Sequence, residues 1–213
     1  MTTMLHRTGP LAATALVCAI LYVTAGIMYD GFFAWRVFTG FFVDNAFLGI
    51  AAIGVTFVIL AGGIDLSVGA GIGCSSIMIA TLVERAGWHP LAAIALVLVF
   101  GTLFGAAMGS LIHAYALPPF IVTLAGMFFA RGLGFVVNQE SIAIRHEFHE
   151  ALAGLPAPVF LAVLGAGIYV AHRTRFGRSV YAVGGNEESA RLMGLPVGRT
   201  KIGVYAGMGM PIV

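Results

Sequence analysis

Apolar residues recur along the chain in runs of roughly 20, separated by short polar connections. A helix rises about 1.5 Å per residue, so such a run is long enough to cross roughly 30 Å of hydrocarbon. The pattern predicts an all-α, polytopic membrane protein, a helical bundle with about six complete transmembrane helices and a partial seventh. The expected spans are 10–28, 45–63, 68–83, 90–115, 119–137 and 157–171, and a seventh begins near Ile202.

Composition agrees with this pattern. The chain is 60% hydrophobic and only 9% charged, whereas soluble domains carry about 25% charged residues. We therefore expect one transmembrane domain over residues 1–213, in contact with membrane lipid. The net charge of +2 is small and spread over short connections, so no nucleic-acid partner is expected.

Cysteine and histidine give no sign of a metal or cofactor. Cys18 and Cys74 lie in apolar runs, and we expect both to be small core residues. The run RHEFHE groups four candidate ligands, His146, Glu147, His149 and Glu150. It lacks the H-E-x-x-H spacing of zinc hydrolases, so we expect a polar outer loop, with contact to a binding protein as the alternative.

The distribution of basic residues predicts the orientation. The connection at residues 172–201 holds six of the 11 Lys and Arg residues, and Arg7 precedes the first span. Because cytoplasmic connections are rich in Lys and Arg, we expect both the N-terminus and this connection to be cytoplasmic. An even number of spans between them agrees, and the connections 29–44, 84–89 and 138–156 then face outward.

Small residues repeat at four-residue spacing in two of the spans. The stripes consist of Gly101, Gly105 and Gly109 in one span, and Gly126, Ala130 and Gly134 in the next. In lipid, helices associate through close backbone approach at such stripes, which we therefore expect to be packing faces. A role in a flexible gate is the alternative.

One carboxylate interrupts the apolar pattern in VILAGGIDLSVGAGIG. The glycines around Asp65 predict a helix break or a re-entrant turn at the cytoplasmic end of the second span. Asp65 itself is expected to be the N-cap of the next helix. The alternative is a role in substrate passage or gating, because carboxylates in membrane segments are costly. The candidate residues are Gly62, Gly63, Asp65, Ser67 and Gly69.

The connection at 172–201 contains the signature of a short capped helix. Asn186 is the expected N-cap, acidic residues occupy the first turn, and Gly194 ends the helix. Leu192, Met193 and Leu195 form an apolar edge. A short amphipathic helix outside the membrane is suited to docking in a groove of a partner. A solvated surface loop is the alternative.

These segments resemble a known family. The run DNAFLGIAAIGVTFVILAGGIDLSVG is similar to the signature of permease subunits of ATP-binding-cassette sugar importers of the ribose and galactose type. The connection HRTRFGRSVYAVGGNEESARLMGL resembles the family's cytoplasmic loop that docks the ATPase. With VTLAGMFFARGLGFVV and NQESIAI, the match resembles the galactofuranose importer permeases most closely and covers residues 44–201.

The resemblance implies a transport subunit in the bacterial inner membrane. Its expected partners are an ATP-binding subunit, a second permease subunit and a periplasmic sugar-binding protein. It implies a cytoplasmic coupling loop at about 172–201, with docking at Gly185, Asn186, Glu187, Glu188, Arg191, Leu192, Met193 and Gly194. The sugar would be a monosaccharide, and galactofuranose is the first choice.

No enzyme activity is expected from the chain. A Walker A loop requires G-x-x-x-x-G-K-[S/T], and the single lysine, Lys201, does not have that spacing. ATP hydrolysis is therefore expected on a separate subunit. The chain is also shorter than members of the family, and ends just inside the seventh expected span, so we expect a C-terminally truncated permease.

Two function classes follow. The first is the permease subunit just described. The second is a stand-alone secondary transporter or channel in which Asp65 couples to an ion, and an inactive truncated permease is a further alternative. The capped helix discriminates between the first two, because a solitary carrier has no use for a docking helix.

Overall fold

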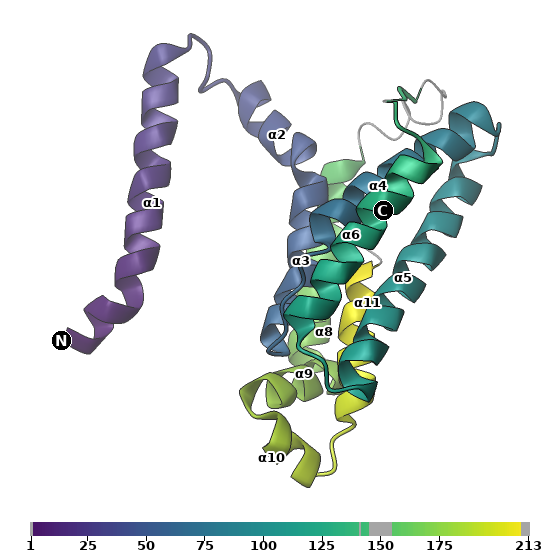
Figure 1. The fold of residues 1–213 in the computed structure, drawn as a ribbon. Coiled ribbons are helices and arrows are strands. Elements are labelled where there is room, and N and C mark those ends of the chain that lie inside the picture. The colour runs from purple at the N-terminus through teal and green to yellow at the C-terminus, as the bar shows by residue number, and fades with distance from the viewer. Residues whose placement is uncertain (1, 141, 145–154, 210–213) are drawn as a thin grey trace. The chain divides into compact units, whose positions relative to one another are not determined.

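The structure, a computed structural model, describes residues 2–140, 142–144 and 155–209, and for residues 2–11 it describes the backbone alone. The residues form two compact units, Met1–Asp44 and Asn45–Val213, which we describe separately. Within the described ranges every regular element is a helix (Figure 1). The all-α prediction is confirmed, while a single domain over the whole chain stays a prediction.

The first unit contains α1 (Thr2–Met28) and α2 (Trp35–Asp44). Tyr22 of α1 lies edge-on to Phe32, with ring centroids 5.1 Å apart, in the connection that follows. Cys18 is exposed, so its predicted place in a core is wrong. Within this unit, α2 is too short to bury side chains along the whole length of α1.

Residues 35–44 of the predicted outer loop form helix α2, so the expectation of a loop is wrong there, while the outward side of this connection stays a prediction. Trp35, Phe38 and Phe42 recur at three- and four-residue spacing, which places them on one face of a helix. Their rings pack in sequence, with centroids 5.5 Å and 5.1 Å apart. The charged residues of the segment hide this helical spacing in a hydropathy profile.

The second unit contains the remaining helices. They are α3 (Ala46–Leu60), α4 (Val68–Ala80), the π-helix η1 (Thr81–Arg85), α5 (Pro90–Ala114), α6 (Pro119–Val137), α8 (Pro156–Arg173), α9 (Arg175–Gly185), α10 (Glu187–Leu192) and α11 (Val197–Gly209). Helices α5, α6 and α8 each begin with a proline, whose fixed φ suits the first helical turn.

The helices agree with the predicted spans at most boundaries. Within the described ranges, four helices are long and apolar enough to cross a membrane, or five if α2 and α3 form one broken span. The count of six complete spans stays a prediction. Helix α11 begins at Val197, before the predicted start near Ile202. Its first turns include the polar residues Thr200 and Lys201, which a hydropathy pattern assigns to the connection.

Helix α5 packs against α11 through the predicted glycine stripe. A Cβ at Gly105 would collide with the backbone carbonyl of Tyr205, and one at Gly109 would lie 2.9 Å from Cα of Ile202. Any side chain larger than hydrogen would force the two helices apart. The prediction that this stripe is a packing face is confirmed.

The second stripe packs α6 against α4 and α5. Ala130 is buried in a cluster with Ala70 and Cys74 of α4, and a Cβ at Gly134 would lie 3.8 Å from Cα of Cys74. Gly126 faces the thioether of Met108 on α5. This stripe is therefore also a packing face, and Cys74 has the predicted place in the core.

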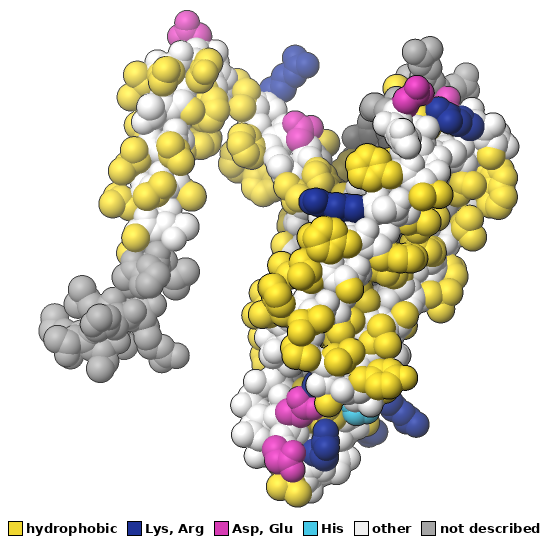
Figure 2. Space-filling model, in the orientation of Figure 1, with side chains coloured by type: hydrophobic (Ala, Val, Ile, Leu, Met, Phe, Trp, Pro, Cys, Tyr) yellow, Lys and Arg dark blue, Asp and Glu magenta, His cyan; other side chains and the backbone are white. Residues whose placement is uncertain are grey.

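The connections expected in the cytoplasm meet at one end of this unit. Gly62, after α3, lies against Gly184 of α9, and His113 at the end of α5 lies against Gly198 of α11. Figure 2 shows basic side chains gathered at this end, around α9 and α10. The arrangement agrees with alternating spans, and the cytoplasmic side of the N-terminus stays a prediction.

Candidate functional site

The connection at residues 172–201, predicted to be the coupling loop, begins with the last residues of α8 and continues with helix α9, for which the sequence pattern gave no prediction. The Thr174 side chain caps it by accepting a hydrogen bond of 3.1 Å from the backbone N–H of Gly177. Phe176, Val180 and Val183 follow at helical spacing, and the two valines are buried. This apolar spacing was a usable signal, but Arg178 between its members lowers the local hydropathy.

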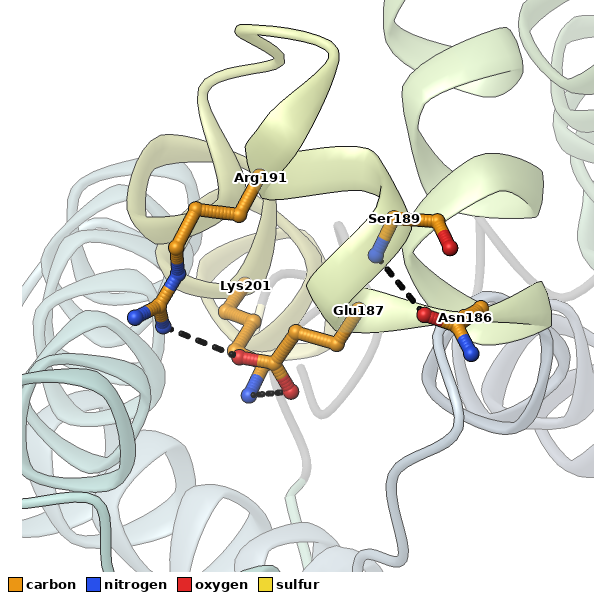
Figure 3. A network of polar contacts seen from close by, with 5 residues as sticks. All are labelled: Asn186, Glu187, Ser189, Arg191 and Lys201. Atoms are coloured by element: carbon orange, nitrogen blue, oxygen red, sulfur yellow. Dashed lines mark hydrogen bonds and ion pairs between the residues drawn. The ribbon is translucent and has the colours of Figure 1, made fainter.

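Helix α10 has the predicted cap. The side-chain oxygen of Asn186 accepts a hydrogen bond of 2.7 Å from the backbone N–H of Ser189 (Figure 3). The helix ends before Gly194, whose φ of +76° lies in the left-handed region that glycine tolerates best. The predicted short helix is confirmed, and its docking role stays a prediction.

Glu187 joins α10 to α11. Its carboxylate accepts a hydrogen bond of 2.7 Å from Nζ of Lys201, whose side chain is only 18% exposed. Arg191 lies 3.8 Å from the other carboxylate oxygen and is 61% exposed (Figure 3). Glu187 is therefore engaged by its own chain, and a contact with a partner stays a prediction for both Glu187 and Arg191.

The two sides of α10 differ in burial. Ala190 is fully buried, in a cluster with Val183 and Val197 that fixes α10 to α9 and α11. Leu195, predicted on the exposed apolar edge, packs against this cluster instead. Leu192 and Met193 point the other way and are 81% and 67% exposed. The helix thus presents a small apolar edge on a rigid support, which is the geometry of a docking element.

The 61–67 linker joins α3 to α4 as the predicted helix break. Gly62 has a φ of +75°, which closes the end of α3. The prediction of Asp65 as N-cap is wrong, because α4 begins at Val68 and Ser67 occupies the N-cap position. Asp65 Oδ1 instead accepts hydrogen bonds of 2.7 Å from the Ser67 N–H and 2.6 Å from its hydroxyl, within the linker itself.

The second carboxylate oxygen of Asp65 is in a different situation. Oδ2 is buried and has no hydrogen-bond partner within the part of the chain that the structure describes. A buried acceptor without a partner is uncommon and costs stability. One carboxylate oxygen of Asp65 is thus bonded within the linker, and the other can accept a proton, a cation or a hydrogen-bond donor.

Two hydroxyls from distant helices hold the linker. The backbone carbonyl of Ile64 accepts hydrogen bonds from Tyr205 of α11 at 3.3 Å and from Thr123 of α6 at 3.4 Å. A Cβ at Gly63 would lie 2.6 Å from the Tyr205 hydroxyl, so glycine permits this approach. The sequence gives no signal for these contacts, because Tyr205 and Ile64 are 141 residues apart.

Of the remaining candidates, Gly69 lines a cavity of about 570 Å³ between α4 and α6. Arg131 of α6 lines the same cavity, although it is not among the site residues predicted from the sequence. The signal was present, because a cation inside an apolar span costs roughly 3 kcal/mol on insertion scales and marks a functional site by default.

The four residues His146, Glu147, His149 and Glu150 lie outside the described residues. Within the described ranges, no group of three or more His, Cys, Asp or Glu residues is placed to hold a metal ion.

Comparison with known proteins gives a family match over most of the chain. The model of the family described as "Branched-chain amino acid transport system / permease component" matches residues 37–211. No solved structure matches.

Several curated proteins are similar in sequence. The inner membrane ABC transporter permease protein YjfF of Escherichia coli K12 is 46% identical over 95% of this chain and 65% of its own length. The fructose import permease protein FruG of Bifidobacterium longum is 32% identical over 89% and 62%. The ribose import permease protein RbsC of Bacillus subtilis is 37% identical over 76% and 53%. The chain therefore spans between about half and two thirds of the length of these relatives.

Proposed function

The chain belongs to the permease family described as "Branched-chain amino acid transport system / permease component", and from this membership we propose that it forms the membrane path of an ATP-driven monosaccharide importer. The resemblance to ABC sugar permeases is confirmed by relatives named for ribose and fructose import. It is a multi-pass protein of the inner membrane. Galactofuranose is the proposed sugar, on the resemblance alone.

The observation that carries the proposal is the construction of α10. Its cap at Asn186, its ion pair with Lys201 and its buried Ala190 fix the helix, while Leu192 and Met193 stay exposed. A rigid apolar edge at the basic end of the molecule supports docking of an ATP-binding subunit. ATP hydrolysis then belongs to that subunit, and the chain itself is not an enzyme.

Helix α11 supports a coupling route from this docking edge into the membrane. Lys201 holds α10, and Tyr205 lies one turn further along the same face of α11, where it binds the Ile64 carbonyl. A displacement of α10 would therefore reach the 61–67 linker through one rigid helix. In this proposal Gly62, Gly63, Asp65, Ser67 and Gly69 form the gating region at the inner end of the path.

Two further partners belong to the proposal. A second permease subunit, identical or different, would complete the path, and a periplasmic sugar-binding protein would deliver the sugar to the outward connections. The family membership and the names of the relatives support both.

The docking proposal is tested by co-purification in detergent with the ATP-binding subunit of the E. coli transporter that contains YjfF. We expect Leu192→Asp and Met193→Asp each to lower capture by about tenfold or more, because exposed apolar anchors dominate protein interfaces. Trp88→Asp, which adds the same charge at another exposed apolar residue, is the matched control. Equal capture by all three variants, each eluting as a single species, would refute docking at α10.

The buried Oδ2 of Asp65, which has no partner among the described residues, favours a second candidate, a stand-alone carrier coupled to protons or cations. The two candidates differ in their energy source. In membrane vesicles, a carrier would accumulate sugar on an imposed ion gradient without ATP and would lose this activity in Asp65→Asn. The importer proposal expects no gradient-driven uptake in either protein.

A further inference from the structure

The cavity between α4 and α6 has a floor of small residues and two flanking ridges. Ala70 and Cys74 of α4 pack with Ala130 of α6 to form the floor. One ridge, on α4, includes Gly73 and Ser76, and the other, on α6, includes Arg131 and Phe135. A volume of about 570 Å³ is within the usual range of roughly 300–1,000 Å³ for small-molecule sites.

Arg131 is the chemically distinctive group of this cavity. It lies about 18 Å along α6 from the start of the helix and about 9 Å from its end, at about 1.5 Å per residue. Among the described residues, none makes a hydrogen bond or ion pair with its guanidinium. This cation therefore lies within an apolar span with its donors unused by the described chain.

The opposite ridge, on α4, has open space beside its glycines. A Cβ at Gly69 or Gly73, one turn apart on α4, would meet no atom within 4 Å. Ser76, one turn further, adds a hydroxyl to the same ridge. Beyond the end of α6, Asn138 and Gln139 bring further polar groups to the outward mouth of the cavity.

These groups define the class of ligand. A guanidinium carries five N–H donors in a planar fork and no acceptor, so its ligand must offer paired oxygens. Neighbouring hydroxyl oxygens on a sugar ring provide such a pair, and they also accept from and donate to Ser76. The aromatic ring of Phe135 on the same ridge offers an apolar surface to the C–H side of a sugar.

We propose that the α4–α6 cavity is a monosaccharide site in the outward half of the path, with Arg131 as its specificity-determining contact. The proposal rests on the proposed function and adds to it the residues that contact the sugar. Arg131 holds two ring hydroxyls through its fork, and the glycine ridge on α4 admits the ring.

The test measures access to the cavity in spheroplasts that contain the full chain. Gly73→Cys is made in a background of Cys18→Ser and Cys74→Ala and is treated from outside with a membrane-impermeant thiol reagent. We expect labelling at this position, and no labelling of Phe128→Cys, an exposed position on α6 that does not line the cavity. Absence of labelling at Gly73→Cys would overturn the proposal.

The second arm adds ribose, arabinose, fructose or galactofuranose. At a sugar concentration ten times Kd, we expect the preferred sugar to slow labelling about tenfold, because the free fraction falls as 1/(1 + [L]/Kd). Arg131→Gln should remove this protection while labelling persists. Labelling that none of these sugars slows, or protection unchanged by Arg131→Gln, would overturn the proposal. Capture of the ATP-binding subunit by the same chain then shows whether the proposed function fails as well.

Discussion

Two helices of the second unit pack through stripes of small residues, but only the stripe on α5 presses closely on backbone, since the nearest backbone atom to a Cβ at Gly134 of α6 is 3.8 Å away. On α5, Gly105 and Gly109 meet backbone atoms of α11, so the two helices are in direct contact. On α6, Gly126 meets the side chain of Met108, and a cavity of about 570 Å³ opens beside Ala130. A stripe of small residues thus identifies a packing face, whereas the opposing helix determines how much space remains.

The difference also fits the proposed roles of the two pairs. Helix α11 directly follows α10, and its close backbone contact with α5 means that the two helices would move together as one rigid element. Helices α4 and α6 pack on Ala70, Cys74 and Ala130, and the cavity beside this contact leaves space for a ligand. Substitutions in the two stripes and at the ion pair of α11 test this difference in packing.

The largest effect is expected for Gly105→Ala. Its Cβ would collide with the Tyr205 carbonyl and lie 3.3 Å from Cα of Ala206, and neither backbone group can rotate away. Overpacking of this kind costs about 1–3 kcal/mol or more. Thermal unfolding in detergent should show an apparent Tm lowered by about 5 °C or more. The matched control is Gly73→Ala, whose Cβ meets nothing and should leave Tm unchanged. Equal Tm values for the two variants would contradict the contrast.

A smaller effect is expected at the base of α11, where Glu187 and Lys201 form the ion pair with α10. Glu187→Lys or Lys201→Glu leaves two like charges facing each other and should weaken the attachment of α10 by about 1 kcal/mol. Hydrogen exchange of the α10 amides should then rise about fivefold.

The double variant that exchanges the two residues is the control for this ion pair. It should restore most of the slow exchange of α10, since the pair is re-formed with opposite polarity, while the exposed pair with Arg191 is lost. Exchange that stays fast in the double variant, or that is unchanged in both single variants, would mean that the pair does not hold the helix.

The smallest effect is expected for Gly126→Ala. Its Cβ would approach Sδ of Met108 at 2.5 Å, but the thioether is the end of a flexible side chain and can rotate away. The cost should stay within about 1 kcal/mol, and the Tm of the variant should lie close to that of the unchanged chain. A loss as large as that of Gly105→Ala would show that side-chain contacts confine α6 as tightly as backbone contacts confine α11.

Much of the helical framework follows from the sequence because lipid imposes a simple rule on it. Long apolar runs must be helical, and Pro90 and Pro119 mark the starts of α5 and α6 at the predicted places. Helices α2 and α9 escape this rule because charged residues interrupt their apolar faces. Both become visible only when the apolar residues are compared at three- and four-residue spacing.

The candidate site is predictable only where its contacts are local. The α10 cap at Asn186 follows from neighbouring residues, and the structure confirms it. Asp65 shows the limit even at short range, because an Asp can cap a helix or bond within the preceding turn, and here it bonds to Ser67. The contact between Tyr205 and Ile64 depends on the packing of α11, which no local pattern contains.

Photo-crosslinking in membranes shows directly whether α10 docks an ATP-binding subunit. A photoreactive amino acid is placed at Leu192 of α10 or at Trp88, an exposed residue in the connection between η1 and α5. The account predicts a crosslink to the co-expressed ATP-binding subunit from position 192 and none from position 88. No crosslink from position 192, or equal crosslinking from both positions, would contradict it.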